Sequence, residues 1–538
     1  MSSAVDDGPV GDRAGGPAVG EVPPGADEAQ ETDTPEREVR AEDLALPNAE
    51  ASAHGALTDQ QLLDRQLGGP AGARPAAAAA DGFDLAGMLT GRAGEGHDLQ
   101  NRMLNPQLAR MLRTIGFDRT YVRAEGPFMY DDKGQEYLDF LAGFGVFAFG
   151  RNHPVVRSAL HQVLDAQLAD LVQFDSPLLA GLLAEKLLAR APHLDRVYFG
   201  SSGTESVEAA LKFARYATGR GRVLYVEHAF HGLTTGSLSV NGAAEFRKGF
   251  DPLLPDTALP LGDLAALERE LARGDVAALL IEPVQGKGVH IPPPGYLKAA
   301  HELLKARGAL LICDEVQTGI GRTGTFFAYE QEGVEPDIVT TAKALSGGFV
   351  PVGATMGKGW IFEKVYSSMD RVLVHDSTFG SNAMAMAAGL AALQVVEDEG
   401  LVANARKIGD LLRTELADRI AKYELLADVR GRGLMIGLEF GKPESLKLKA
   451  GWNTLQAARR GLFAQTVIAA LFQRHRILTQ VAGDHMDVIK LLPPLTIGEA
   501  EAGRFLEAFD DVMRDAHKGK GLMWDFGRTL VKQAMRRS

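Results

Sequence analysis

The sequence predicts an α/β fold built on a mainly parallel sheet. Short apolar runs alternate with stretches of helical periodicity, such as residues 294–308. The runs lie at residues 223–230, 277–284, 309–316 and 336–341. This alternation is typical of parallel strands joined by covering helices. After about Ala391 the pattern changes to longer helices around a few short strands, which predicts a second, smaller domain.

Composition places the chain among globular proteins. The 538 residues are 45% hydrophobic and 24% charged, and no apolar run approaches the roughly 18 residues of a membrane span. The acidic N-terminus has no apolar signal core, so secretion is not predicted. The single cysteine, Cys313, lies in an apolar strand and fits a reducing cytoplasm. We therefore expect a cytoplasmic protein.

Charge is concentrated at the two ends of the chain. Residues 1–53 hold 13 Asp and Glu against 3 Arg, which accounts for most of the net charge of −13 and argues against a nucleic-acid-binding body. Residues 1–97 are predicted to form a largely disordered tail, with short helices near 59–67 and 83–89. Residues 517–538 predict a basic amphipathic helix. That helix can pack on the protein's own surface, meet the acidic tail, dock a partner or lie on a membrane.

Two charged side chains follow neighbouring strand predictions. Asp314 ends one buried run, and Lys343 follows the next. Alone, Asp314 could be a cap or a surface ion pair, and Lys343 a solvated loop lysine. Ligands bind beyond the carboxyl ends of such strands, where a desolvated lysine has a lowered pKa. An amine paired with an anion is what pyridoxal phosphate requires, for its aldehyde and its pyridine nitrogen.

A phosphate cradle is predicted at Ser202, Gly203 and Thr204. A strand runs into these residues and a strong helix follows them. Free N–H groups and the helix dipole favour phosphate at such a start, and glycine allows close backbone approach. The same residues also make an ordinary helix cap. The segment alone therefore leaves both interpretations open.

The residues from Asp314 to Gly324 (DEVQTGIGRTG), Lys343 and the Gly347–Gly348 pair together resemble the signature of class-III aminotransferases. These are fold-type I enzymes that use pyridoxal phosphate. The resemblance runs from about Tyr130 to about Leu495. It implies a large cofactor domain at 156–390 with a mainly parallel seven-stranded sheet. It also implies a smaller α+β domain formed by residues 98–155 and 391–516.

The resemblance also implies roles for site residues. Lys343 would form a Schiff base with pyridoxal phosphate, Asp314 would bind the pyridine nitrogen, and Phe230 would stack on the ring. Gln317 would lie near the phenolic oxygen, and Thr378 would bind phosphate across the interface of an obligate homodimer. The implied cofactor contacts are Ser202, Gly203, Thr204, Phe230, His231, Glu282, Asp314, Gln317, Lys343 and Thr378. His231 could instead be structural.

Four residues concern the substrate. Phe144 and Phe147 lie in a segment that would cover the pocket and make it apolar. Lys287 and Lys490 stand where many relatives carry Glu and Arg. Because Arg binds carboxylate bidentately and Lys does not, we expect weak or altered recognition of an α-carboxylate. Alternatively, the two lysines bind a different anion, such as a distal carboxylate.

The implied activity is transamination by a ping-pong route, from a primary amine or ω-amino compound to a carbonyl acceptor. The motifs look closest to the putrescine, ornithine and acetylornithine aminotransferase group. No metal site is expected. An aminomutase, decarboxylating aminotransferase or racemase of the same fold stays an alternative, because cofactor motifs do not separate these activities. A non-catalytic scaffold is a second alternative, against which the intact Asp314 and Lys343 argue.

Overall fold

The computed structural model describes residues 83–519, except 171–173 and 255, together with residues 524 and 527. These residues belong to the compact unit Gln66–Ser538. Most of the predicted acidic tail and of the predicted basic C-terminal helix lies outside the described residues. The end of the predicted tail forms helix α2 (Leu85–Gly91), which the Asp84 side chain caps by accepting from Gly87 N. Among the described helices, none is long and apolar enough to cross a membrane.

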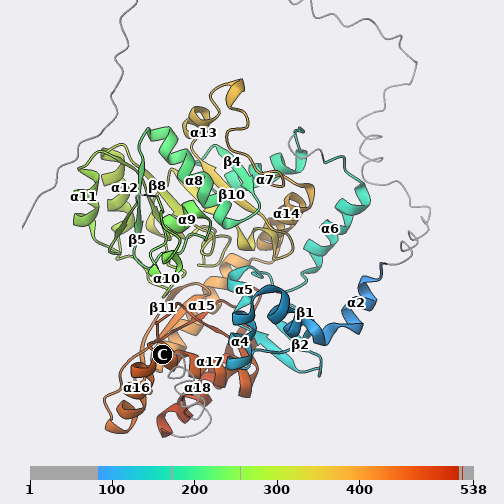
Figure 1. Cartoon of the computed structure of the whole chain (residues 1–538), viewed down its shortest axis with the longest axis vertical. Helices are drawn as coiled ribbons and strands as arrows, with labels where there is room; N and C mark the ends of the chain where they lie inside the picture. The colour runs from blue at the N-terminus through green and yellow to red at the C-terminus, as the bar shows by residue number, and fades with distance from the viewer. Residues whose placement is uncertain (1–82, 171–173, 255, 520–523, 525–526, 528–538) are drawn as a thin grey trace, which may run out of the picture. The chain divides into compact units, whose positions relative to one another are not determined.

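A seven-stranded sheet carries the centre of the chain, as the sequence predicted (Figure 1). Its order is β4 (Arg196–Gly200), β10 (Gly353–Gly357), β9 (Ile338–Thr341), β8 (Leu310–Asp314), β7 (Val276–Ile281), β5 (Arg222–Val226) and β6 (Thr257–Leu259). Only β10 runs antiparallel to its neighbours. The carboxyl ends of the other strands therefore meet at one edge.

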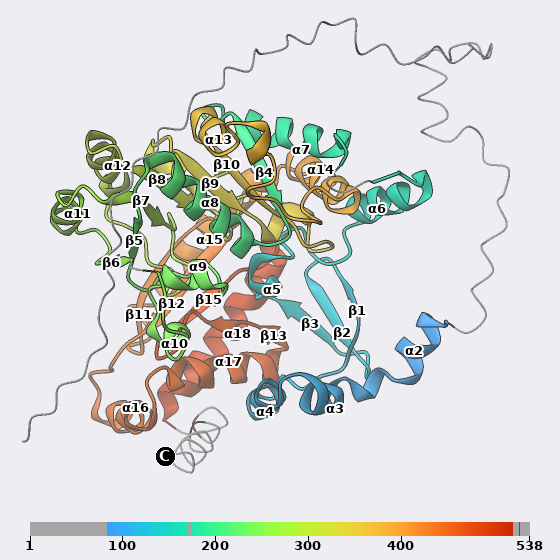
Figure 2. The same ribbon diagram turned by 45° about the horizontal axis from the view of Figure 1, so that its top comes forward.

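The sheet is buried on both faces, which explains its continuous apolar runs. Along β8, Leu310 and Ile312 join one hydrophobic cluster, whereas Leu311 and Cys313 join the other. Helix α8 (Gly203–Thr218) packs across β4, β5, β7, β8, β9 and β10 on the first face (Figures 1 and 2). Side chains of α11 (Leu264–Leu271), α12 (Tyr296–Ala306), α7 (Leu178–Ala189) and α14 (Ala383–Asp398) join the second cluster.

Two smaller sheets combine the beginning and end of the described chain. One has the order β1 (Tyr121–Glu125), β2 (Phe128–Asp131), β3 (Glu136–Asp139) and β13 (Ile477–Leu478). The other has the order β11 (Leu426–Arg432), β12 (Met435–Phe440), β15 (Val488–Leu491) and β14 (Gln480–Val481). Because β3 pairs in parallel with β13, residues predicted as 98–155 and 391–516 share one sheet. The domain boundaries themselves stay predictions.

The other helices connect or cover these sheets (Figure 2). They are α3 (Gly96–Leu99), α4 (Pro106–Ile115), α5 (Ala142–Gly145), α6 (Pro154–Ala166), α9 (Thr235–Ser239), α10 (Ala244–Arg247), α13 (Gly359–Val365), α15 (Leu401–Asp418), α16 (Leu446–Ala458), α17 (Leu462–His475) and α18 (Glu499–Lys518). Short 3₁₀ or π turns lie at Ala93–Glu95, Gln100–Leu104, Ala328–Glu332, Lys343–Ser346 and Met369–Arg371.

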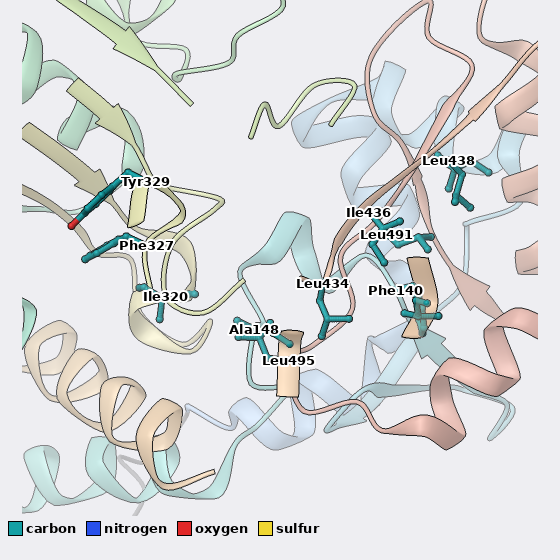
Figure 3. Packing of buried hydrophobic residues seen from close by; sticks show 14 of the residues in the cluster. Phe140, Ala148, Ile320, Phe327, Tyr329, Leu434, Ile436, Leu438, Leu491 and Leu495 are labelled. Atoms are coloured by element: carbon teal, nitrogen blue, oxygen red, sulfur yellow. The ribbon is translucent and has the colours of Figure 1, made fainter. Parts of the chain in front are cut away.

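One hydrophobic cluster joins the N-terminal segment, the large sheet and the C-terminal sheets (Figure 3). Phe140 lies near Leu491 and Ile436, and the N–H of Leu492 donates to the carbonyl of Phe140 at 2.9 Å. Ala148 lies beside Leu495, whose N–H donates to the Ala148 carbonyl at 2.6 Å. This packing carries α5, which lies between Phe140 and Ala148, to the carboxyl edge of the seven-stranded sheet.

Candidate active site

A cavity of about 840 Å³ opens at the carboxyl edge of the large sheet. Residues that follow β4, β5, β7, β8 and β9 line it, together with residues of α5 and β14–β15. Parallel strands place their carboxyl ends together, and this edge is where α/β sheets bind ligands. The cavity collects most of the residues that the sequence singled out: Phe144, Ser202, Gly203, Thr204, Phe230, His231, Glu282, Lys287, Asp314, Gln317, Lys343 and Lys490.

Asp314 is a buried carboxylate with three hydrogen-bond donors. Its side chain is 4% exposed. Oδ1 accepts from Val316 N at 3.0 Å and from Thr340 Oγ1 at 3.1 Å, and Oδ2 lies 2.7 Å from His231 Nδ1. Since a carboxylate only accepts, this contact places a proton on His231 Nδ1. His231 Nε2 is buried and has no partner among the described residues. These three contacts satisfy the hydrogen-bonding needs of a polar side chain inside the protein.

Lys343 follows β9 after one intervening residue, Ala342. It begins a 3₁₀ turn with a backbone φ of 43°, which is unusual for a residue other than glycine. Burial lowers the pKa of the Lys343 amine, while the carboxylates of Asp314 and Glu282 oppose that shift. A lysine with a lowered pKa is more often neutral, and the neutral amine is the nucleophilic form.

The start of α8 forms a cradle of free amides. Ser202 caps the helix by accepting from Glu205 N. The N–H groups of Gly203 and Thr204 have no acceptor in the part of the chain that the structure describes. A Cβ on Gly203 would lie 2.9 Å from Val316 Cγ1 and 3.4 Å from Ala342 Cβ. Close packing and unpaired amides at a helix start suit an anion such as phosphate.

Glu282 supports the aromatic wall of the cavity. It is buried, and its two oxygens accept from Phe230 N at 3.0 Å and from Gly286 N at 2.7 Å. Burial raises the pKa of the Glu282 carboxyl. The Phe230 ring meets the edge of Phe246 at 5.4 Å between centroids. Glu282 thereby fixes the backbone that presents Phe230 to the cavity.

Gln317 and Lys490 form a continuous hydrogen-bonded chain. Lys490 is 4% exposed, and its Nζ donates to Gly286 O at 2.6 Å and to Gln317 Oε1 at 3.0 Å. Gln317 Nε2 donates in turn to Phe144 O at 2.9 Å. Burial, with Lys343 as the largest adverse neighbouring charge, lowers the pKa of Lys490 to about 7.

Lys287 also lines the cavity and is partly buried. Its Nζ lies 4.6 Å from the ring centroid of Phe246 and 5.7 Å from that of Phe230. These distances suit cation–π contact. Burial lowers the pKa of the Lys287 amine.

Comparison with known proteins decides the family. The family model "Aminotransferase class-III" matches residues 113–513. The chain belongs to the class-III aminotransferases. It is a transaminase of the fold-type I architecture, as the sequence predicted. Enzymes of this family depend on pyridoxal phosphate.

Curated relatives carry the same assignment. The aminotransferase PigE of a Serratia species is 37% identical over 449 residues, which cover 77% of this chain and 53% of the relative. The match thus spans about half of that relative's length. The acetylornithine aminotransferase of Methanopyrus kandleri is 40% identical over 403 residues, which cover 74% of this chain and 95% of the relative.

Solved structures share the fold. An ornithine aminotransferase from Toxoplasma gondii superposes with a TM-score of 0.67 at 28% identity. The match covers 78% of this chain and 97% of the Toxoplasma chain. An amine transaminase from an uncultivated Pseudomonas species has a TM-score of 0.65 at 31% identity and covers 74% and 95%.

The cavity of this aminotransferase fits the family's cofactor on its own geometry. Lys343 offers an amine, and Asp314 offers a buried anion at the end of the neighbouring strand. The unpaired amides of Gly203 and Thr204 offer a phosphate cradle. Phe230 offers an aromatic face. These groups line the same cavity, so the residues present match what pyridoxal phosphate requires.

Two predicted site residues lie outside the cavity lining of the aminotransferase. The Phe147 ring packs under the Arg151 guanidinium, 3.9 Å from its centroid, and against Gly348. The structure therefore places Phe144 and Val146 on the wall in place of Phe147. Thr378 is exposed on a loop, and its predicted contact across a dimer interface stays a prediction.

Several lining residues were not predicted from the sequence, including Phe246, Phe349 and Gln480. Phe246 lies on the short helix α10, where no motif marks it. Gln480 belongs to the two-residue strand β14, which is too short to produce a periodic signal. Only the folding of distant segments onto the sheet edge brings these side chains together.

Proposed function

We propose that this cavity binds pyridoxal phosphate and transfers an amino group from a primary amine or ω-amino compound to a carbonyl acceptor. The observation that carries the proposal is the pair Asp314 and Lys343. Asp314 ends β8 and Lys343 follows the adjacent parallel strand β9. Both line one cavity, where three donors hold the carboxylate and burial lowers the pKa of the amine.

Different residues of the cavity would bind different parts of the cofactor. The start of α8, at Ser202, Gly203 and Thr204, would bind its phosphate. Phe230 would lie against its ring, and Asp314 would face its pyridine nitrogen. When bound, pyridoxal phosphate supplies an electron sink for the carbon that bears the substrate's amino group.

Lys343 is the proposed catalytic base and acid. Its Nζ would take the proton from the substrate carbon that bears the amino group and deliver it, within the same half-reaction, to the cofactor's C4′ carbon; the second half-reaction would move a proton the opposite way. Burial lowers the pKa of this amine, which favours its neutral, basic form. Val316, Thr340 and His231 supply the hydrogen bonds of the Asp314 carboxylate. A charged Asp314 favours a proton on the nitrogen that it faces.

We further propose that a second copy of the chain completes the site through Thr378. Its exposed position at the end of a loop leaves the side chain available to a partner subunit. The relatives named for acetylornithine, ornithine and amine substrates support an amine donor and a carbonyl acceptor as the small-molecule partners. A cytoplasmic location agrees with one cysteine, Cys313, which is buried.

Borohydride trapping tests the cofactor assignment. Reduction of the cofactor-loaded protein, followed by peptide mass mapping, should place pyridoxyl phosphate on Lys343. The Lys343→Ala variant should carry no label and lose turnover, whereas Lys287→Met, at another cavity lysine, should keep the label on Lys343. Label on a different lysine, or turnover retained by Lys343→Ala, would refute the proposal.

A single half-reaction separates transamination from the alternatives. Incubation with an amine donor alone should release a carbonyl product and leave pyridoxamine phosphate on the protein. A racemase or aminomutase would return the cofactor in its starting form. A screen of diamines, ω-amino acids and long-chain amines then identifies the donor.

A further inference from the structure

We propose that Lys490 is a positioning residue that, through Gln317, fixes α5 over the cavity, and that it is not an anchor for a substrate carboxylate. The statement about the substrate carboxylate rests on the proposed function. The positioning of α5 does not rest on it, because the contacts that support α5 join three protein segments directly. They join β15, the segment after β8, and α5.

Helix α5 has a backbone that needs support from outside. Its residues Ala142, Gly143 and Phe144 have φ angles of 44°, 58° and 62°. Left-handed conformations at residues with side chains are strained and persist where the surrounding structure holds them. The Phe144 side chain is 57% exposed, so side-chain burial provides little of that support.

Gln317 supplies a contact from outside α5. Its Nε2 donates to Phe144 O at 2.9 Å, across 173 residues of sequence. A side-chain amide can rotate by half a turn and exchange its oxygen and nitrogen. The contact between Gln317 Oε1 and the protonated form of Lys490 removes that freedom, because an ammonium group can only donate to the oxygen.

Lys490 is well placed to hold Gln317. It lies on β15, where it pairs with Gly437 of β12 and with Gln480 of β14. A strand between two neighbours is a rigid base. Its Nζ is already engaged by Gly286 O and Gln317 Oε1 inside the protein. Two of the three N–H groups of the ammonium are thus used inside the protein, which leaves at most one for a carboxylate.

Lys287 provides the contrast within the same cavity. Its Nζ lies over the rings of Phe246 and Phe230, and no hydrogen bond among the described residues joins it to Gln317 or Phe144. Removing its charge therefore changes the electrostatics of the cavity without breaking the chain of contacts to Phe144. This makes Lys287→Met a matched control for Lys490→Met.

Hydrogen exchange in the cofactor-free protein tests the positioning role. The reporters are the amides of Phe144 and Phe147, which donate to Leu141 O and Ala142 O. Lys490→Met should speed their exchange on the order of fivefold, as expected for the loss of one buried hydrogen bond. Gln317→Glu should do the same, because glutamate still accepts from Lys490 but cannot donate to Phe144 O. The double variant should exchange no faster than either single one, and Lys287→Met should match the parent.

The inference would be overturned if the Phe144 and Phe147 amides exchange at the parent's rate in Lys490→Met but faster in Gln317→Glu. If Lys490→Met does not fold, the Gln317→Glu result decides, since unchanged exchange in that variant also overturns it. With loaded enzyme, a Lys490→Met variant whose KM rises tenfold or more for 2-oxoglutarate but not for butanal would identify a carboxylate anchor and refute the proposal. Because exchange is measured without cofactor or turnover, its failure is distinct from failure of the proposed transaminase function.

Discussion

Replacing Gly203 by alanine should weaken cofactor binding through a steric conflict at the phosphate cradle. The new Cβ would lie 2.9 Å from Val316 Cγ1 and 3.4 Å from Ala342 Cβ. The Val316 methyl is on a short, stiff side chain, so the start of α8 or the segment after β8 has to move. Either movement displaces the free amides of Gly203 and Thr204, or shifts the Val316 N–H that binds Asp314.

The magnitude follows from the cost of overpacking. An extra methyl group in a close-packed site costs about 1–3 kcal/mol. If that strain is relieved at the expense of the cofactor contacts, the dissociation constant for pyridoxal phosphate rises by a factor of about 5 to 150. Cofactor-free protein titrated with pyridoxal phosphate, followed by absorbance or by quenching of protein fluorescence, measures this change directly.

The matched control is Gly503→Ala in α18, where a Cβ would meet nothing within 4 Å. That variant should keep the parent's cofactor affinity and gain up to about 1 kcal/mol of stability, because alanine favours a helix interior. A folded Gly203→Ala variant with a dissociation constant within twofold of the parent's would refute the reasoning about the cradle.

Two further predictions concern charge. Asp314→Asn should lower kcat on the order of a hundredfold with the fold intact by circular dichroism, because the charge facing the cofactor is lost; a loss below tenfold contradicts that role. For Lys490, burial lowers the pKa from 10.5 to about 7. Above pH 10.5 the amine is neutral in both the folded and the unfolded protein. As the pH falls from 10.5 towards 7, the unfolded chain binds the proton first, so the folded state loses stability. Below about pH 7 the amine is protonated in both states and the loss stays constant. Melting curves of cofactor-free Lys490→Met should therefore decline less than the parent's between pH 10 and 7, and parallel declines would contradict the buried lysine.

The chemistry-bearing strands of this fold could be predicted from local patterns. The apolar runs before Asp314 and Lys343 are continuous because β8 and β9 are covered on both faces, so they stand out in the sequence. The start of α8 is marked by Ser202 and by the helical pattern after it. Local regularity thus located the strand ends, and with them the edge at which a site forms.

The contacts that support these residues could not be predicted in that way. His231 reaches Asp314 across 83 residues, and Lys490 reaches Gln317 across 173. The pairing of β3 with the two-residue strand β13 has no local signal either. Phe147 illustrates the limit, because its neighbour Phe144 faces the cavity while its own ring packs under Arg151. Which of two nearby aromatics faces a pocket depends on the unusual backbone of α5.

The sequence by itself determined the family, the mainly parallel sheet and the identity of the groups available for chemistry, because apolar periodicity and motif order are properties of neighbouring residues. Tertiary structure alone decided which groups share the cavity and in what state. Lys490 shows the difference most clearly. Its sequence position suggested an anion-binding lysine, whereas folding buries its amine and engages it with Gly286 and Gln317. Desolvation and hydrogen bonding depend on distances between segments far apart in the chain, and only the folded protein sets those distances.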